Sequence, residues 1–206
     1  MRHVMSSRYA IPLIAILTSI SAVIFISTLV RATVYAPEGG DDIAPSGIPG
    51  PPVVAQSESL PARLLIPSLS IDARVQQVGM NEKGQMKAPS NFKDVGWYRY
   101  GTVPGQLGSA VMDGHVDNGL SLGGVFKRLG DVKVGDDVYV IAKDGSELHF
   151  IVRGVETYPY AAGPAERIFG ANDVARLNLI TCAGTWVRGD QTYSDRLVVY
   201  TTFVAT

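Results

Sequence analysis

Short apolar runs, separated by glycine- and proline-rich connections, make up the chain from Leu60 onward. Within 71–77, Ile71, Ala73 and Val75 alternate with polar residues, which is the period of a strand with one buried face. Runs of this kind predict strands at 63–66, 71–77, 109–113, 136–142, 147–155, 176–181 and 196–203. Helical periodicity is scarce, with one or two short turns expected within 163–173. The pattern predicts an all-β fold, either a closed barrel or a sandwich.

The N-terminal end has a different pattern, because the 22 residues of Tyr9–Val30 carry no charge. About 20 apolar residues in a helix span the ~30 Å hydrocarbon core of a bilayer, so this segment predicts one transmembrane helix. Arg2 and Arg8 precede the segment, and Arg31 is the only basic residue that closely follows it. The positive-inside rule then favours a cytoplasmic N-terminus, with the rest of the chain outside the cell.

A cleaved signal peptide is the alternative interpretation of this segment, with 34–36 as the cleavage site. Apolar regions of signal peptides are usually about 7–15 residues long, which is shorter than this one and favours an uncleaved anchor. The segment that follows lacks any strand or helical period and is rich in proline and glycine, as linkers are. The expected organisation is a cytoplasmic tail (1–8), a signal anchor (9–31), a linker (32–59) and one folded domain (60–206).

Composition limits the range of possible functions. The chain has 206 residues, of which 46% are hydrophobic, so one domain with a substantial core is expected. The formal net charge is −1 and no basic stripe is present, which argues against nucleic acid as a partner. The chain holds a single cysteine, so an exported domain would contain no internal disulfide.

That cysteine, Cys182, ends the apolar run 179–182 and is followed by Ala183, Gly184 and Thr185. Free cysteines are most often small buried apolar residues, and the run supports that interpretation. The residues after Cys182 predict that it lies at a strand end, facing a loop. A side chain there can be exposed while the strand holds it in place, and a thiolate can then act as a nucleophile.

His115 is the best-placed of three histidines to exchange a proton with such a thiol. His3 precedes the predicted membrane segment, and His149 lies within an alternating strand. His115 follows a predicted strand and precedes a glycine-rich loop. A second interpretation stays open, because Asp113, His115 and Asp117 would share one face of a fully extended chain and could bind a metal ion. Gly114 and the turn residues after it argue against a continuous strand.

Arg196 opens the last predicted strand and follows Asp195. A weak ion pair with Asp195 or Asp173 would explain it. A guanidinium can also donate fixed hydrogen bonds to a carbonyl oxygen that gains negative charge. Arg188, in the same connection, competes for that role.

The sequence Leu179-Ile180-Thr181-Cys182, with Arg196 opening the final strand and Gly114-His115-Val116-Asp117 upstream, resembles the sortases, the cysteine transpeptidases of Gram-positive cell surfaces. The Gly-His-Val-Asp form, with Val95-Gly96-Trp97-Tyr98 before it, is most similar to the class F subgroup. The resemblance covers about residues 60 to 206 and is carried by the order His, Cys, Arg.

The resemblance implies a closed β-barrel of about eight strands with short helical turns. It also implies that Cys182 attacks a sorting signal similar to Leu-Pro-x-Thr-Gly between Thr and Gly, that His115 moves protons, and that Arg196 stabilises the oxyanion or holds the substrate. Expected partners are surface proteins that bear this signal, an amine of a cell-wall precursor, and the plasma membrane through the N-terminal helix. The chemistry needs no cofactor. A hydrolytic cysteine protease and a non-catalytic, membrane-tethered binding barrel remain alternatives.

Overall fold

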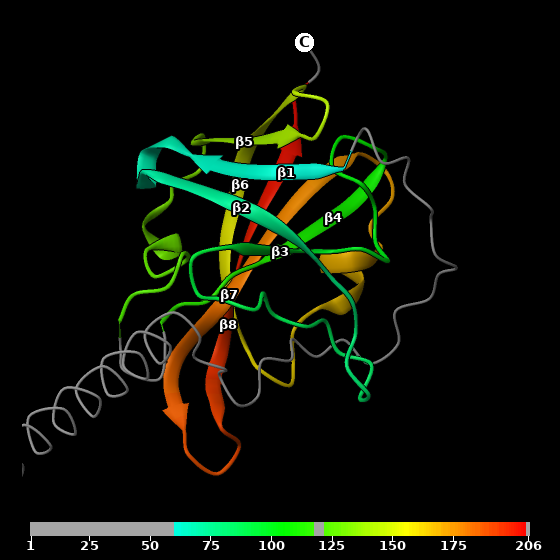
Figure 1. The fold of residues 1–206 in the computed structure, drawn as a ribbon. Coiled ribbons are helices and arrows are strands. Elements are labelled where there is room, and N and C mark those ends of the chain that lie inside the picture. Colours follow the sequence, from blue (N-terminus) through cyan, green and yellow to red (C-terminus); the bar gives the residue numbers. More distant parts are fainter. Residues whose placement is uncertain (1–59, 118–121, 205–206) are drawn as a thin grey trace, which may run out of the picture. The chain divides into compact units, whose positions relative to one another are not determined.

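The computed structural model describes residues 60–117 and 122–204 (Figure 1). The strands are β1 (Pro61–Ile66), β2 (Ile71–Val78), β3 (Val95–Tyr98), β4 (Gly108–Asp113), β5 (Asp137–Ala142), β6 (Glu147–Pro159), β7 (Ala175–Val187) and β8 (Thr192–Phe203). Three short helical turns lie between them, η2 (Pro67–Leu69), η3 (Leu129–Asp131) and η4 (Glu166–Gly170). The described part of the chain is therefore nearly all strand and connection, as the sequence predicts.

The strands form one closed barrel in the order β1-β2-β3-β4-β7-β8-β6-β5, with β5 returning to β1. Neighbouring strands are antiparallel except for β2–β3 and β4–β7, which are parallel. The predicted barrel is confirmed and the sandwich alternative is wrong. Figure 1 shows β7 and β8 continuing past the other strands as a long hairpin.

Two apolar clusters follow from the alternation of side chains along the strands. Leu177, Leu179 and Val199 belong to the cluster inside the barrel. Their neighbours Ile180 and Val198 point to the opposite face and belong to a second cluster on the outer surface. This outer cluster is covered by the β2–β3 connection, through Met86, and by η4, through Ile168. The outer face of β7 and β8 is thus partly buried, which matters for the candidate site.

The predicted strands match β1, β2, β4, β5 and most of β6. The strand β3 was not predicted from sequence, because it is only four residues long and Gly96 interrupts its apolar run. All four of its residues are buried, since Val95 and Trp97 join the inner cluster and Tyr98 joins the outer one. Between them Gly96 lies so close to Val78 that a β-carbon there would be 2.9 Å from its side chain.

The tail, anchor and linker expected at 1–8, 9–31 and 32–59 lie outside the described residues. Over 60–117 and 122–204, no helix is long and apolar enough to cross a membrane.

Candidate active site

Cys182 and Arg196 are paired directly across β7 and β8. Because side chains alternate along a strand, both lie on the same outer face as Ile180 and Val198. The prediction that Cys182 ends a strand and that Arg196 begins one is wrong. β7 continues five residues beyond Cys182 to Val187, and β8 begins four residues before Arg196.

A bulge explains this difference. The pairing of β7 with β8 shifts register between Ala183 and Trp186, and Gly184 there has φ of +81°. A bulge inserts an extra residue into a strand and re-aims the side chains around it. The Ala183-Gly184-Thr185 sequence resembles a loop, but the strand passes through it. β7 is therefore paired with β8 both before and after Cys182, which holds this residue in place. Cys182 is partly exposed.

His115 reaches the same place from β4, which ends two residues earlier. The parallel pairing of β4 with β7 sets Asp113 opposite Ile180. Past that pair, the Gly114 amide donates to the Ile180 carbonyl at 3.1 Å, and Thr181 Oγ1 donates to the Gly114 carbonyl at 2.7 Å. The chain thus continues beside β7, and His115 lies level with Cys182. The expected position after a strand end is confirmed.

The imidazole of His115 is buried, with 4% of the residue exposed. Its Nε2 lies 2.9 Å from the backbone carbonyl of Pro89, in the β2–β3 connection. A carbonyl oxygen only accepts hydrogen bonds, so Nε2 must carry the proton. Proton exchange with a reacting group would then occur at Nδ1. Nothing in the sequence points to Pro89, because a backbone carbonyl leaves no residue-type signature.

Arg196 is also buried, with 5% exposed. Its terminal nitrogens donate to the carbonyls of Tyr193 (3.1 Å) and Asp195 (2.8 Å) and to Thr192 Oγ1 (2.8 Å). The guanidinium carbon lies 4.4 Å from the centre of the Tyr160 ring. These contacts fix the plane of the guanidinium.

The alternative interpretation of Arg196, an ion pair with Asp195 or Asp173, is not what the structure shows. Arg196 contacts the backbone carbonyl of Asp195, while the Asp195 carboxylate accepts from Ser194 Oγ at 2.7 Å. Asp173 instead pairs with Arg176. The buried Nε of Arg196 has no hydrogen-bond partner among the described residues. A buried donor without a partner costs stability, so it is a natural place for a ligand oxygen.

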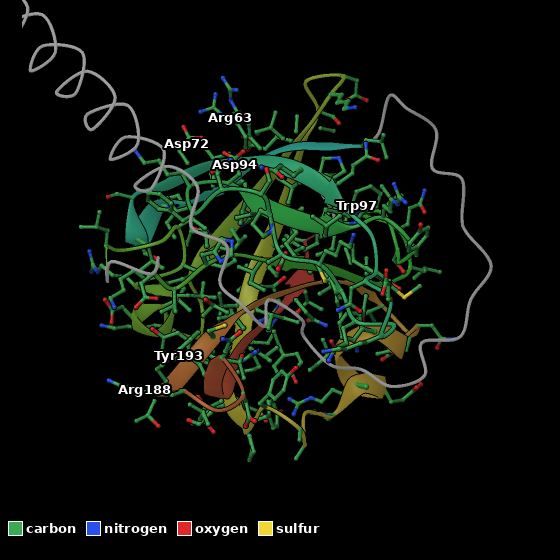
Figure 2. The ribbon with its side chains drawn as sticks, turned by 60° about the horizontal axis from the view of Figure 1, so that its bottom comes forward. Arg63, Asp72, Asp94, Trp97, Arg188 and Tyr193 are labelled. Carbon is green, nitrogen blue, oxygen red and sulfur yellow. The ribbon has the colours of Figure 1, made fainter. Side chains whose placement is uncertain are left out.

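Arg188, the competing arginine, lies in the connection between β7 and β8 and is exposed. Figure 2 shows it at the hairpin, beyond Tyr193 and directed outward. Six residues of extended chain separate it from Cys182, about 20 Å. The structure does not bring Arg188 to the other candidates.

The arrangement required for Asp113, His115 and Asp117 to share one face is absent, because β4 ends at Asp113. Asp113 is buried within the barrel wall. Asp117 Oδ2 accepts a hydrogen bond from the Tyr193 hydroxyl at 2.7 Å and lies 3.9 Å from Lys127 Nζ. Within the described part of the chain, no group of three His, Cys, Asp or Glu side chains is arranged to hold a metal ion.

Two connections frame the site. Gln85 Nε2, in the β2–β3 connection, donates to the Tyr160 hydroxyl at 3.1 Å. Tyr160 begins the β6–β7 connection, and its amide donates to the Ser194 carbonyl at 2.9 Å. Through Pro89 and Gln85, one connection therefore supports both His115 and the ring beneath Arg196. A narrow apolar pocket lies beside Arg196, with Ile168 and Phe169 among its walls.

A family model described as the sortase domain matches residues 64–204. Sortase A from Corynebacterium diphtheriae is 19% identical with a TM-score of 0.56, over 71% of this chain and 61% of that chain. Sortase C1 of GBS Pilus Island 1 is 20% identical with a TM-score of 0.53, over 70% and 65%. Sortase C-1 from Actinomyces oris is 22% identical with a TM-score of 0.54, over 70% and 73%.

At these identities the solved structures show a shared fold and no more. This chain spans less than two thirds of the length of the first two. A comparison with curated proteins found no match. The family model, however, covers more than half of the chain and ends one residue past β8, so the chain belongs to the sortase family.

Proposed function

We propose that this protein is a cysteine transpeptidase in which Cys182, His115 and Arg196 carry the reaction. One observation supports this most. Cys182 and Arg196 are paired across β7 and β8, and the β4–β7 register, which ends beside Ile180, leads the chain after β4 to the same level of the barrel at His115. A nucleophile, a proton carrier and a fixed donor of hydrogen bonds are the groups that acyl transfer needs.

In the first step, the Cys182 thiol passes its proton to Nδ1 of His115, and the resulting thiolate attacks the Thr carbonyl carbon of a Leu-Pro-x-Thr-Gly-like signal. A carbon–sulfur bond forms, and the negative charge moves to the carbonyl oxygen, where the Arg196 guanidinium donates hydrogen bonds. The carbon–nitrogen bond then breaks. The leaving Gly amine takes a proton from Nδ1 of His115, and a thioester remains on Cys182.

In the second step, an amine of a cell-wall precursor attacks the thioester. His115 Nδ1 accepts a proton from that amine, the new carbon–nitrogen bond forms, and the carbon–sulfur bond breaks. The thioester conserves the energy of the original amide, so the surface protein is transferred without another energy source. These steps use no cofactor.

The finer assignment also belongs to this proposal. The Gly114-His115-Val116-Asp117 sequence supports placement in the class F subgroup of sortases. The uncharged Tyr9–Val30 segment supports a single-pass plasma-membrane protein with a cytoplasmic N-terminus and an extracellular catalytic domain. External protease applied to intact cells tests the topology, because it should remove the domain while leaving a membrane-bound fragment. A domain that stays protected while other surface proteins are cut would contradict it.

The test of the chemistry uses the full chain in neutral detergent, a Leu-Pro-x-Thr-Gly peptide and an added amine. Mass spectrometry should detect the acyl group on Cys182 and the amine-joined product. Cys182→Ala should lose both the acyl group and the amine-joined product, because the sequence contains no second cysteine. Thr185→Ala is the matched control, since it lies on the exposed side of the same hairpin and should keep both products.

The outcomes separate the alternatives. Cleavage by the wild type with only the hydrolysed product, at saturating amine, would identify a hydrolytic cysteine protease. An unmodified Cys182 that resists both peptide and alkylating reagents, in a folded protein, would favour a non-catalytic binding barrel. Continued cleavage by Cys182→Ala would refute the cysteine mechanism.

A further inference from the structure

A second cavity, of about 320 Å³, lies on the outer face of β6, β8 and β7, on the far side of η4 from the narrow pocket beside Arg196. Its volume falls within the range typical of small-molecule sites. Its lining is rich in arginine, and the residues are Arg153, Arg167, Ala171, Arg176, Tyr200, Thr201 and Thr202. Three guanidinium groups from three different elements therefore meet at one cavity.

Arg153 is directed into this position by a bulge. The pairing of β6 with β8 shifts register between Val152 and Gly154, so Arg153 is the inserted residue. Bulges of this kind re-aim a side chain away from the regular alternation. Arg153 Nε donates to Thr202 Oγ1 at 2.7 Å, which orients the guanidinium. Among the described residues, Arg153 forms no ion pair, so its charge is not neutralised by a neighbouring carboxylate.

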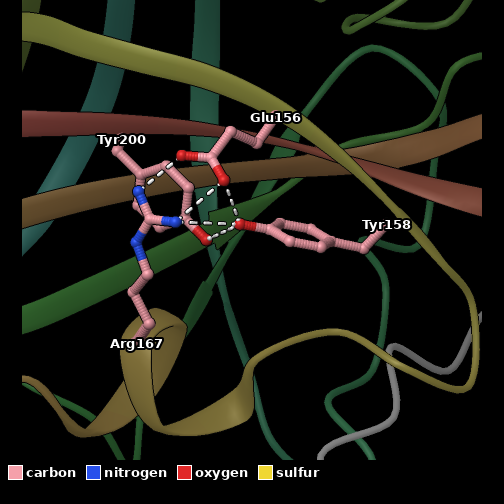
Figure 3. A network of polar contacts seen from close by, with 4 residues as sticks. All are labelled: Glu156, Tyr158, Arg167 and Tyr200. Atoms are coloured by element: carbon pink, nitrogen blue, oxygen red, sulfur yellow. Dashed lines mark hydrogen bonds and ion pairs between the residues drawn. The ribbon is translucent and has the colours of Figure 1, made fainter.

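Arg167 and Arg176 are anchored by carboxylates that lie outside the cavity lining. Arg167 bonds Glu156 through both terminal nitrogens, and its guanidinium carbon lies 4.1 Å from the centre of the Tyr200 ring (Figure 3). Arg176 pairs with Asp173, and 23% of its side chain is exposed. Each guanidinium has five N–H donors, so some N–H groups of Arg167 and Arg176 remain available to a ligand.

The floor of the cavity is rigid. Tyr200 has only 6% of its surface exposed, and its hydroxyl lies 3.1 Å from the Tyr158 hydroxyl. Arg176 lies six residues before Cys182 on β7, a separation of about 20 Å. The cavity is therefore distinct from the candidate active site, and ligand binding to it can be measured without an activity assay.

We propose that this cavity binds a phosphate group, as a phosphate ester or a diphosphate, with Arg153 as its principal contact. Planar guanidinium groups bind phosphate oxygens through paired, charge-assisted hydrogen bonds. A carboxylate offers two oxygens, whereas a phosphate offers three or more in a tetrahedral arrangement. Donors that approach from β6, β7 and η4 match the tetrahedral shape better than the planar one.

A rival cavity lies between β1, β2 and the β5–β6 turn, with Arg63, Arg74 and Lys143 among its lining residues. Arg63 there is paired with Asp72, which itself lines the cavity and would repel an anion. The cavity beside η4 is favoured because its two carboxylates are not among the lining residues.

The probe is inorganic diphosphate, titrated calorimetrically into the full chain in neutral detergent. Wild type should bind one diphosphate per chain, and the affinity should fall as salt is raised. Arg153→Gln should weaken binding by about 10-fold or more, the range for hydrogen bonds to a charged group. The affinity of Arg153→Lys for diphosphate should lie between those of wild type and Arg153→Gln, because lysine keeps the charge without the planar pair of donors.

Arg74→Gln is the matched control, because it removes the same charge from the rival cavity. It should bind diphosphate as wild type does. The proposal is overturned if wild type does not bind diphosphate, if Arg153→Gln binds it unchanged, or if Arg74→Gln is the variant that loses it. Thermal unfolding of each variant checks that the barrel is intact.

Two sources could supply the phosphate, a soluble ester or a lipid headgroup. Native mass spectrometry of the same preparation, with a short-chain phosphatidylglycerol added beside diphosphate, distinguishes them. A lipid adduct that displaces diphosphate and is lost in Arg153→Gln would assign a headgroup. Diphosphate binding that the lipid leaves unchanged would assign a soluble phosphate. Either result supports phosphate recognition at Arg153.

Discussion

At the residue scale, Arg196 is held by contacts that a lysine cannot reproduce. Its nitrogens reach two carbonyls and a hydroxyl in different directions, while its plane lies over Tyr160. We therefore expect Arg196→Lys to lower kcat/KM for a sorting peptide by ~10²–10³, the usual cost of losing an oxyanion-stabilising donor. Steady-state kinetics measures this loss, and thermal unfolding separates it from misfolding.

Arg188→Lys is the control for this prediction, since Arg188 is exposed at the hairpin end. It should retain normal turnover, because exposed charges of the same sign exchange at little cost. A stable Arg196→Lys variant with near-normal kcat/KM would remove Arg196 from oxyanion stabilisation.

His115 combines a chemical role with a buried position, so alanine is a poor test of the chemistry. A histidine just past a strand end often adds little to packing, but this one is 4% exposed and bonded to Pro89. His115→Gln keeps an N–H that can donate to the Pro89 carbonyl but cannot exchange protons near neutral pH. We expect turnover to fall by about 10²–10⁴, the range for general acid–base groups, with little change in unfolding temperature.

His115→Ala should lose turnover and also unfold at a lower temperature, because it leaves a cavity and an unpaired buried carbonyl. The comparison of the two variants by kinetics and thermal unfolding separates catalysis from packing. Normal turnover in His115→Gln would exclude proton transfer by this residue.

At the element scale, the bulge after Cys182 depends on Gly184. Its φ of +81° is in the left-handed region, and a β-carbon there would lie 2.1 Å from Asp195 Oδ2 and 2.2 Å from Ser194 Oγ. Gly184→Ala should destabilise the protein by at least about 1–2 kcal/mol, the cost of a left-handed backbone with a side chain. Chemical denaturation measures the free energy of unfolding.

Gly189→Ala is the matched control, because a β-carbon at Gly189 would meet no atom within 4 Å and its φ is not in that region. It should leave the free energy of unfolding almost unchanged. Equal free energies of unfolding for Gly184→Ala and Gly189→Ala would show that the protein does not need the left-handed backbone at position 184.

The turn η4 is fastened to the barrel by a polar network. Arg167 bonds Glu156, and the Tyr158 hydroxyl donates to Glu156 and lies beside the Tyr200 hydroxyl (Figure 3). The hydrogen bond from Arg167, and then that from Tyr158, lowers the pKa of Glu156 below its ordinary value of 4.5. Burial raises the pKa of the Tyr200 phenol, which stays neutral in this network.

A depressed carboxyl pKa stabilises the folded state above the unfolded pKa, and this contribution is lost as the pH falls through the folded value. Wild type should therefore unfold at a higher temperature than Glu156→Gln at about pH 6, and the difference should shrink below about pH 4. Thermal unfolding across this pH range measures it. Glu147→Gln, at the start of β6, controls for loss of an exposed charge. A difference between wild type and Glu156→Gln that is constant with pH would contradict the role of the carboxylate.

The alternation of β2 and the apolar run of the fully buried β4 were enough to predict both strands, but β3 was not predictable from sequence. β2 shows plain alternation, whereas β3 is buried on both sides and carries Gly96 at its centre. The strand through Cys182 was cut short in prediction because Gly184 resembles a loop residue, although it forms a bulge. Local pattern cannot separate these cases, since the pairing partner decides which one forms.

At the scale of the whole molecule, the candidate site depends on pairings between distant segments. The resemblance placed Cys182, His115 and Arg196 together, and residue patterns alone left each of them with a plausible structural role. The parallel β4–β7 pairing and the antiparallel β7–β8 pairing supply the juxtaposition. No local period predicts such pairings, nor the contact of Pro89 with the imidazole, because both arise from tertiary packing.

Closure of the barrel depends on the first strand, so the position at which the folded unit begins can be tested. β1 pairs with both β2 and β5, and the Leu60 carbonyl accepts from the Lys143 amide at 2.9 Å. A chain that starts at Leu60 should be soluble, fold cooperatively and remain active. A chain that starts at Pro67 loses Leu64 and Ile66, both fully buried, and leaves two strand edges unpaired.

Burial of one such side chain contributes about 1.5–3 kcal/mol, and a domain of this size has only about 5–15 kcal/mol of net stability. Loss of two core side chains together with the β1 hydrogen bonds should therefore unfold the shorter chain. Circular dichroism during thermal unfolding, together with peptide cleavage, measures both shortened chains against the full one. Failure of the chain that starts at Leu60 would mean that residues before Leu60 belong to the folded unit. Cooperative unfolding of the chain that starts at Pro67 would mean that the barrel does not need β1 to close.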